Sequence, residues 1–448
     1  MQNGALNVGE GPAESVIRKM TRLAVEHKAI NLSQGFPNEP PNAEMVWGAV
    51  TSLIGGDDDG AADIDNITVD EASLRGVLGV SEKEDLTKYT LKDVFGKLRK
   101  SEDLLNQYSF PFGRSQLRHA ISEYYNKFYG CRPDPDDEIT VCLGATEGMS
   151  AVLRAVTKAG DGVVVVQPFH EMYVNQVKVF HLQPHFVSLI EDGGGWHLDM
   201  AGLESKLALP NTRVLLLNSP HNPTGKVFSE RELQSICDLC VQHNVYLVTD
   251  EIYEHIIYTS TPHYCVAAWP DMKDNAIIVN SMSKTGSATG WRVGWVIASR
   301  DITSKIRAIH DTIAMQAPTP LQRAVQTLLH ADKATFAGIK DAYEVKRDVL
   351  LKGLLSVGFR ASEPEGAYYL FARYGGVPVI GSMGPTEAAI YLTKQVGVAC
   401  VPGDNFYGVP VEGGAENQYL RFAFCRSLSH LKEAVHRLHT WHDTVKTQ

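Results

Sequence analysis

Short apolar runs, rich in β-branched residues, alternate with longer amphipathic stretches between about residues 139 and 300. Each run is almost continuously apolar, which is typical of strands buried on both faces of a parallel sheet. The stretches between the runs are long enough for helices, so the pattern predicts an α/β fold with a mainly parallel sheet covered on both faces. The predicted strands are 162–167 (GVVVVQ), 213–218 (RVLLLN), 245–250 (VYLVTD), 276–281 (AIIVNS) and 293–299 (VGWVIAS).

One stretch between two of these strands has a clear helix start. Ser229 and Glu232 have the spacing of a capping box, in which each side chain bonds the other residue's main-chain N–H. Apolar residues then recur at helical spacing, which predicts an amphipathic helix with one face toward the core. The residues on that face are Leu233, Ile236, Cys237, Cys240 and Val241.

Two motifs resemble metal or redox sites. Cys237 and Cys240 form a CxxC, but both lie on the predicted core-facing stripe, which favours buried structural thiols. His436, His439 and His442 recur every three residues near the C-terminus and could bind a transition metal. No carboxylate is placed to complete that set, and an amphipathic surface helix is the favoured interpretation. We therefore expect no metal site.

The segment from 53 to 102 departs from the surrounding composition, with an acidic start and a basic end. We interpret it as a surface insertion that has a disordered Gly/Asp start followed by one or two short helices. The run Asp57-Asp58-Asp59-Gly60 suggests calcium, but the EF-hand spacing would place Gly55 at the first ligand position. A solvated acidic loop is the better interpretation.

Composition narrows the class of protein. The chain has 448 residues, of which 44% are hydrophobic and 21% charged, and this allows two or three globular domains. Its net charge of −10 argues against a nucleic-acid binder. Seven cysteines are too few for a disulfide scaffold, and we see no signal-peptide core and no apolar stretch of about 20 residues. We expect a cytoplasmic enzyme without membrane or nucleic-acid partners.

Polar residues follow several of the predicted strands, at the edge where open parallel sheets bind ligands. Asn222 follows the strand 213–218, and Asp250 ends the strand 245–250, with Tyr253 close behind. Lys284 and Arg292 follow the strand 276–281. An arginine, a lysine and a carboxylate suit a cofactor that has a phosphate, an aldehyde and a protonatable ring nitrogen.

These residues lie in motifs that resemble those of class I aminotransferases, which are pyridoxal 5'-phosphate enzymes of fold type I. The motifs LSQGFP and LNQYSFPFG most resemble the branch containing kynurenine aminotransferase, glutamine transaminase K and cysteine-S-conjugate β-lyase. The resemblance covers nearly the whole chain except the insertion and the first dozen residues. The motifs are LSQGFPNEPP (32–41), LNQYSFPFG (105–113), NSPHNPTG (218–225), VTDEIYE (248–254), SMSKTGSATGWRVGW (281–295) and YLRFAF (419–424).

The resemblance implies a role for each residue of these motifs. Lys284 forms the internal aldimine, a Schiff base with the cofactor, and then moves the proton between the substrate's Cα and the cofactor. Asp250 pairs with the pyridine nitrogen and keeps it protonated. Asn222 and Tyr253 hold the ring oxygen. The phosphate is held by Arg292, Ser281, Ser283 and the main-chain amides of Ala145 and Thr146, which we expect at a helix N-terminus.

Three further positions concern the substrate and the partner subunit. The resemblance implies that Tyr108 reaches the phosphate of a neighbouring subunit, and therefore a homodimer with shared active sites. Arg421 stands among apolar residues of a predicted strand, where a buried guanidinium needs an anionic partner. A structural carboxylate could serve, but the resemblance favours the substrate's α-carboxylate. Gly35 would let the main chain approach the substrate closely.

The chain departs from its family at positions beside the cofactor and the substrate. His170 takes the place of the aromatic residue that stacks on the cofactor, and it could also act as an acid or base. A register shift would instead place Phe169 or Tyr173 there. Ile17 stands where the kynurenine branch has a substrate-caging tryptophan, and Thr146 where it has a tyrosine. These changes weaken the case for kynurenine as substrate.

The leading hypothesis is therefore transamination between a 2-oxo acid and an α-amino acid that is hydrophobic, aromatic or glutamine-like. The alternative is β- or γ-elimination, replacement or oxidase chemistry with the same cofactor. A third hypothesis, a non-enzymatic protein built on this fold, is disfavoured by the intact motifs. The expected domains are an N-terminal arm and part of the small domain (1–45), a large cofactor-binding domain (46–320) and a small α+β C-terminal domain (321–448).

Overall fold

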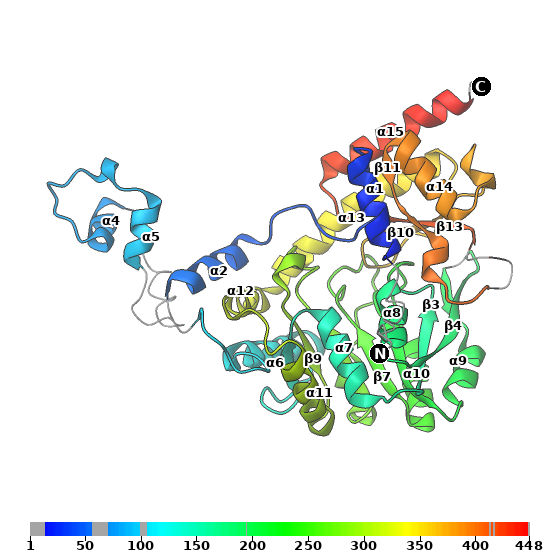
Figure 1. Ribbon diagram of the computed structural model, residues 1–448, viewed down its shortest axis with the longest axis horizontal. Coiled ribbons are helices and arrows are strands. Elements are labelled where there is room, and N and C mark those ends of the chain that lie inside the picture. Colours follow the sequence, from blue (N-terminus) through cyan, green and yellow to red (C-terminus); the bar gives the residue numbers. More distant parts are fainter. Residues whose placement is uncertain are drawn as a thin grey trace, which may run out of the picture.

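The computed structural model describes residues 14–55, 70–98, 105–193, 195–411, 414 and 417–446. Its centre is an eight-stranded sheet with the order β2-β9-β8-β7-β6-β3-β4-β5 (Figure 1). The strands from β8 to β4 are parallel, and β2, β9 and β5 pair antiparallel at the edges. The bounds are β2 Ile139–Cys142, β3 Gly162–Gln167, β4 Gln183–Glu191, β5 Trp196–Leu198, β6 Thr212–Asn218, β7 Tyr246–Asp250, β8 Ala276–Asn280 and β9 Gly294–Ile297.

Helices cover both faces of this sheet, as the continuous apolar runs predict. In β3, for example, Val163 and Val165 pack into one apolar cluster while Val164 and Val166 pack into another. One face is covered by α7 (Ala145–Val156), α8 (Glu171–Val179) and α11 (Arg300–Ile313). The other is covered by α6 (Ser115–Tyr129), α9 (Met200–Leu207), α10 (Glu230–His243) and α12 (Thr319–His330).

Helix α10 begins as the sequence predicts. Ser229 and Glu232 form the capping box, and Cys237 and Cys240 are buried in the core. The prediction for Val241 is wrong, because its side chain is 46% exposed. It lies near the end of the helix, where the apolar face turns away from the sheet.

A second, smaller region combines the two ends of the chain. Its antiparallel sheet has the order β10-β13-β12, and a short parallel pair, β1 with β11, joins the N-terminal segment to it. The helices of this region share a separate apolar cluster with these strands. The bounds are α1 Val16–Glu26, β1 Ile30–Asn31, α13 Lys333–Ser356, β10 Tyr369–Arg373, α14 Pro385–Tyr391, β11 Val398–Ala399, β12 Val401–Pro402, β13 Tyr419–Ala423 and α15 Leu428–Lys446.

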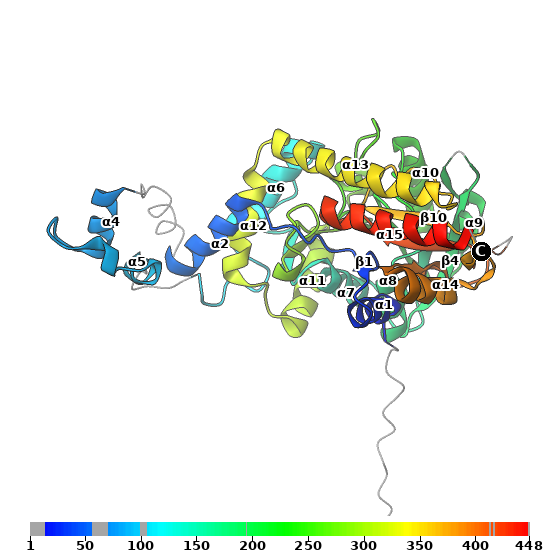
Figure 2. The same ribbon diagram turned by 90° about the horizontal axis from the view of Figure 1, so that it is seen from above.

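The predicted insertion contains two short helices, α4 (Glu71–Leu78) and α5 (Leu91–Leu98), which project from the body of the molecule beyond α2 (Figures 1 and 2). Helix α2 extends over Ala43–Gly55, so the first residues of the predicted insertion, from Leu53, continue this helix. The acidic run from Asp57 to Gly60 lies outside the described residues.

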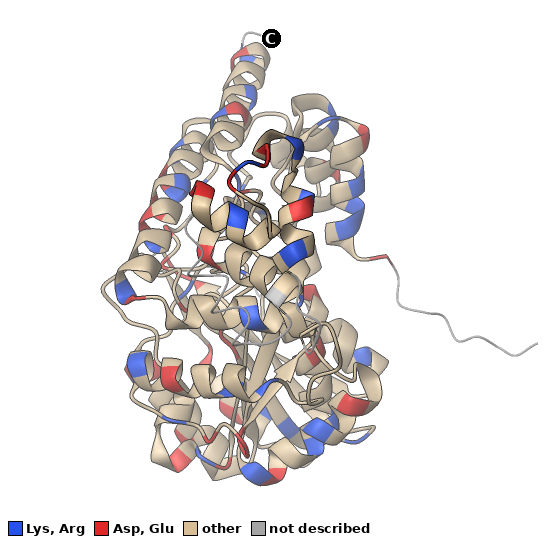
Figure 3. Ribbon diagram, turned by 90° about the vertical axis from the view of Figure 1, so that its left-hand side faces the viewer, with Lys and Arg blue, Asp and Glu red and all other residues tan. Residues whose placement is uncertain are grey.

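Acidic and basic residues are interspersed over the side of the molecule drawn in Figure 3. The helix α15 carries His436, His439 and His442 as predicted, with His442 buried and His439 in a hydrogen bond with Ser356. Within the described ranges, no helix combines the length and apolar character needed to cross a membrane.

Candidate active site

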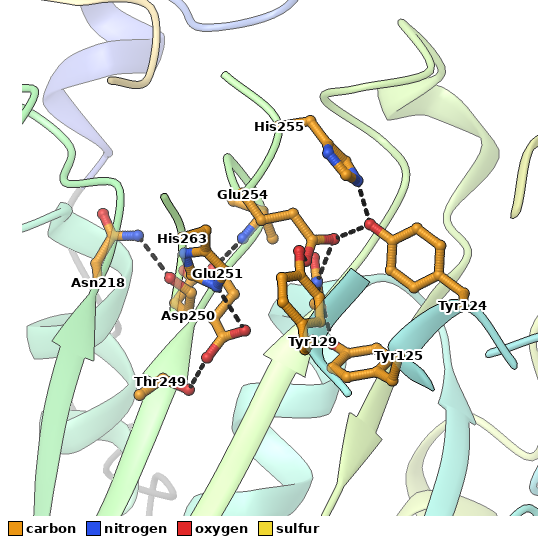
Figure 4. Close-up of polar contacts among 12 residues, drawn as sticks. Tyr124, Tyr125, Tyr129, Asn218, Thr249, Asp250, Glu251, Glu254, His255 and His263 are labelled. Carbon is orange, nitrogen blue, oxygen red and sulfur yellow. Dashed lines mark hydrogen bonds and ion pairs between the residues drawn. The ribbon is translucent and has the colours of Figure 1, made fainter. Parts of the chain in front are cut away.

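The site lies beyond the carboxyl ends of three neighbouring parallel strands, where ligands bind in open α/β sheets. Asn218, Asp250 and Asn280 are the last residues of β6, β7 and β8, and all three side chains are buried. Because polar groups are costly to bury without partners, each of them takes part in a hydrogen-bond network. Figure 4 shows Asn218 and Asp250 side by side at this edge.

Asp250 is held by residues from two neighbouring elements. The hydroxyl of Tyr173 donates to its Oδ2 at 2.6 Å. Asn218 donates to the Asp250 carbonyl at 2.8 Å and accepts from the main-chain N–H of Asn222 at 2.7 Å. Burial raises the pKa of Asp250 to about 6, despite the hydrogen bond from Tyr173. The carboxylate is therefore poised to gain from a cationic partner, such as a protonated ring nitrogen.

Lys284 lies in the turn after β8, and its amine contacts the N-terminal segment of the chain. Its Nζ donates to the carbonyl oxygen of Gly35 at 2.9 Å, and the Tyr368 hydroxyl donates to the same oxygen at 3.1 Å. Desolvation lowers the pKa of Lys284 to about 8, and the positive charges of Arg292 and Arg421 add to this effect. A substantial fraction of the amine is therefore neutral, and nucleophilic, near neutral pH.

An anion-binding cradle forms between α7 and the turn after β8. Helix α7 begins at Ala145, and no side chain caps its start, so its first N–H groups are left for another acceptor. The Arg292 guanidinium lies against Gly144, since a Cβ on that residue would be 2.3 Å from Arg292 Nη2. Ser281 and Ser283 are buried in the same turn as Lys284. The cradle thus offers a cation, helix N–H groups and two hydroxyls.

Arg421 is 1% exposed and comes from the middle of β13. Its Nη1 donates to Asn222 Oδ1 at 3.0 Å and its Nη2 to the Ser33 carbonyl, while Nε has no partner. Its guanidinium lies 4.4 Å from the ring centroid of Tyr369 and 5.0 Å from that of Phe406. No carboxylate among the described residues forms an ion pair with it. The site therefore presents a buried, unneutralised cation beside Asn222.

His170 caps the start of α8, with its ring 5.8 Å from that of Tyr173 and nearly perpendicular to it. Desolvation, with the charges of Arg421 and Lys284, lowers the pKa of His170 to about 3, so the imidazole is neutral. Its Nδ1 is buried without a partner. Such an orphaned nitrogen within reach of the charges of the site suits a ligand that supplies a hydrogen.

The structure places the two remaining predicted residues differently. Ile17 is buried in α1, one turn before Thr21, whose hydroxyl contacts Ser33 beside the site. Tyr108 is 79% exposed, and the nearby Phe110 is 68% exposed. Within this chain Tyr108 therefore lies at the surface rather than among the buried residues of the site.

Sequence reasoning missed a polar network behind Asp250, drawn in Figure 4. Glu254 accepts hydrogen bonds from Tyr124 at 2.7 Å, from Asn280 at 2.8 Å and from Tyr129. Asn280 in turn accepts from the main-chain N–H of Ser281 at 2.7 Å. The network therefore ties the end of β7 to the turn that carries Ser281 and Lys284. Its only sequence signal is the second glutamate of VTDEIYE.

Among the residues that the structure describes, two groups of side chains are close enough together to hold a metal ion: Glu251 with Glu254 and His263, and Cys142 with Glu147 and His310. In the first, Glu251 accepts from Thr249 at 2.8 Å and pairs with His263 at 2.9 Å. In the second, Glu147 accepts from the Leu143 N–H and pairs with His310. Protein donors therefore already occupy the carboxylates of both groups.

The complete donor set fits a phosphorylated aldehyde with a basic ring nitrogen. The cradle around Arg292 suits the phosphate, the amine of Lys284 suits the aldehyde, and the buried Asp250 suits the nitrogen. Arg421 remains for the carboxylate of a second ligand. The structure thus brings Asn222, Asp250, Tyr253, Lys284 and Arg421 around one point, as the motifs predict.

Comparisons of the sequence and of the structure with known proteins all point to aminotransferases. Residues 77–438 match the family described as aminotransferase class I and II. A probable N-succinyldiaminopimelate aminotransferase from Mycobacterium tuberculosis is 30% identical over 432 residues, covering 95% of this chain and 96% of the relative. Kynurenine–oxoglutarate transaminase 1 from Mus musculus is 30% identical over 447 residues, covering 94% of each chain. The structure of YbdL from Escherichia coli, a protein with a methionine aminotransferase function, is 26% identical with a TM-score of 0.79, covering 97% of this chain and all of the other.

Proposed function

The chain belongs to the class I and II aminotransferases, fold type I enzymes that use pyridoxal phosphate, and we propose that Lys284, Asp250, Arg292 and Arg421 are the charged groups with which it binds this cofactor and its substrate. As an aminotransferase, it moves an amino group from an α-amino acid to a 2-oxo acid. The observation that carries the residue assignment is the convergence of these four groups at one strand edge, with Arg421 buried and unpaired by any described carboxylate.

Three groups of residues would hold the cofactor. Arg292, Ser281, Ser283 and the N-terminal amides of α7 at Ala145 and Thr146 hold its phosphate. Asp250, supported by Tyr173, holds the ring nitrogen in its protonated form, because the buried carboxylate is stabilised by a cation beside it. Asn222 and Tyr253 hold the ring oxygen, and the neutral ring of His170 stacks on the cofactor's face.

Bound pyridoxal phosphate supplies an electron sink for the charge left on the substrate's Cα when its proton is removed. Arg421 binds the α-carboxylate and so fixes the orientation of the Cα–H bond. Asn222, which already contacts Arg421 Nη1, shares in this orientation. Lys284 would accept the proton released from Cα at its Nζ and give it up again, because a pKa near 8 suits the amine to both roles near neutral pH.

For the substrate we propose an amino acid with a hydrophobic, aromatic or glutamine-like side chain. The carboxylate-binding arginine is bordered by the rings of Tyr369 and Phe406, and Ile17 is buried in α1, the helix whose Thr21 contacts Ser33. The relatives fit this class, because they include a kynurenine–oxoglutarate transaminase and a protein with a methionine aminotransferase function. The alternative is elimination, replacement or oxidation on the same cofactor. Two features favour it: His170, whose Nδ1 has no partner among the described residues, and the insertion predicted at 53–102.

We also propose that the enzyme is a homodimer with shared sites. Tyr108 and Phe110 are exposed aromatic side chains two residues apart, and neighbouring exposed apolar groups suit a surface that another subunit covers. A second copy that covers them would receive Tyr108 at its own phosphate cradle. The smaller region around β10 and β13, which supplies Arg421, would close over the substrate as a separate domain.

The experiment that tests these assignments is reduction with borohydride of protein loaded with pyridoxal phosphate, followed by peptide mass analysis. The expected result is a phosphopyridoxyl group on Lys284 and on no other lysine. A panel of amino acids and 2-oxo acids then identifies the substrates. Stoichiometric exchange supports transamination, whereas release of ammonia or peroxide supports the alternative chemistry.

A further inference from the structure

Tyr369 touches three residues of the proposed site, although no motif marks it. Its hydroxyl lies 2.9 Å from the hydroxyl of Tyr253, and both side chains are buried. Arg421 lies over its ring at 4.4 Å, and a Cβ on Gly35 would be 1.9 Å from its hydroxyl oxygen. The ring is thus held between a cation and the main chain, with its hydroxyl aimed at Tyr253.

The number of hydroxyl protons decides which of the two tyrosines, Tyr253 or Tyr369, donates to the other. Tyr253 has one proton, and under the proposed function it donates that proton to the cofactor's phenolic oxygen. Its oxygen must then accept from Tyr369. The adjacent Tyr368 donates to the Gly35 carbonyl at 3.1 Å instead.

We infer that Tyr369 is a positioning residue whose hydroxyl donates to Tyr253, fixes the direction of the Tyr253 O–H bond, and thereby sets how tightly the Lys284 nitrogen holds its proton when cofactor is bound. This inference rests on the proposed function. Donation from Tyr253 draws negative charge from the phenolic oxygen beside the Lys284 nitrogen. Less charge there makes protonation of that nitrogen less favourable. A donor behind Tyr253 strengthens this effect, because hydrogen bonds in a chain polarise one another.

The test is a pH titration of the visible absorbance of the bound cofactor. In Tyr369→Phe the midpoint should rise by about 0.5–1 pH unit, the size expected when one hydrogen bond is lost. The KM for the amino acid should stay within about twofold, because the phenylalanine ring still covers Arg421. The variant alters none of the other titratable or charged groups that face the tyrosine pair. These are Asp250, Arg421, Cys425, Tyr368, Tyr173, Tyr343 and Arg426.

Two further variants sharpen the test. Tyr258→Phe is the matched control, because it removes a buried hydroxyl that donates to the Ala367 carbonyl, and its midpoint should equal that of wild type. Tyr253→Phe should shift the midpoint more than Tyr369→Phe does, and the double variant no further than Tyr253→Phe alone. A wild-type midpoint in Tyr369→Phe, or additive shifts in the double variant, would overturn the inference. Failure of the proposed function would appear differently, as wild-type protein with no cofactor band and no reduced adduct on Lys284.

Discussion

Gly35 lies directly against the hydroxyl of Tyr369, 334 residues further along the chain. A Cβ at position 35 would be 1.9 Å from the tyrosine oxygen and 2.7 Å from Cζ of its ring. The same glycine's carbonyl accepts from Lys284 and Tyr368. Any displacement of Gly35 therefore moves a partner of the proposed catalytic amine.

We predict that Gly35→Ala lowers kcat/KM by tenfold or more and destabilises the fold by about 1–3 kcal/mol, the usual cost of overpacking a filled space. Adding Tyr369→Phe should recover part of the stability, since the closest atom is then absent. Gly338→Ala is the control: no atom lies within 4 Å of the new methyl group, and alanine favours the α13 helix. Equal effects of the two glycine variants in steady-state kinetics and urea unfolding would contradict the prediction.

Arg421→Met should raise the KM for the amino acid and lower kcat/KM by about 10²–10³-fold, because a buried charge-assisted pair with the substrate carboxylate is lost. The cofactor-free protein should unfold at equal or higher urea concentration, since an unneutralised cation leaves the core. Arg373→Met, on the neighbouring strand β10, removes a half-exposed ion pair with Glu191 and should leave the KM unchanged. A KM for Arg421→Met that matches wild type would refute the assignment.

Glu254→Gln should destabilise the protein by about 1–3 kcal/mol. In wild type the Tyr124 hydroxyl and the Asn280 amide donate to a carboxylate, whereas in the variant they would face a neutral amide group. Since Glu254 acts on the cradle through Asn280 and Ser281, cofactor should also dissociate faster. Dialysis against buffer without cofactor, followed by absorbance, measures this loss. Glu363→Gln, a change at an exposed carboxylate paired with Arg347, serves as the control. The interpretation fails if cofactor retention is the same in both variants.

The strands and the charged residues of the site could be predicted from sequence because both are local signals. An apolar run such as that of β3 identifies a buried strand, and a motif such as VTDEIYE identifies Asp250 at the end of β7. The antiparallel direction of β9 could not be read in this way, because its apolar run resembles that of a parallel strand.

Contacts between distant segments were equally hidden. Tyr369 stands in an apolar stretch, where an inward-facing tyrosine is typical of any core. Its hydrogen bond with Tyr253 depends on how the smaller region that contains β10 packs against the larger one. Tyr173 could be assigned only to stacking, whereas its hydroxyl bonds Asp250.

The pKa of Asp250 predicts a pH-dependent trade-off between stability and function. In the folded cofactor-free protein this pKa is raised from 3.8 to about 6, so the folded state holds the proton more tightly than the unfolded state. Stability is therefore lost as the pH rises from about 4 through 6, by up to about 3 kcal/mol. Asp250→Asn removes this effect, so the variant should gain stability over wild type between pH 5 and pH 8.

Urea unfolding of both proteins without cofactor, at those two pH values, measures the difference. With cofactor bound, the order should reverse, because the protonated ring nitrogen stabilises the ionised Asp250 of wild type. A difference between the two cofactor-free proteins that does not change with pH would contradict the pKa shift.

The shared-site dimer makes a prediction about mixed subunits. Lys284→Ala should be inactive, and Tyr108→Ala should bind cofactor about tenfold more weakly, the effect expected for one lost phosphate contact. In a mixed dimer of the two variants, one site would contain both changes, while the other would combine an intact Lys284 with an intact Tyr108 from the partner. Unfolding and refolding the two proteins together should therefore restore activity at cofactor concentrations too low for Tyr108→Ala alone. If Tyr108 served its own chain's site, every mixed dimer would lack an intact site and co-refolding would restore no activity.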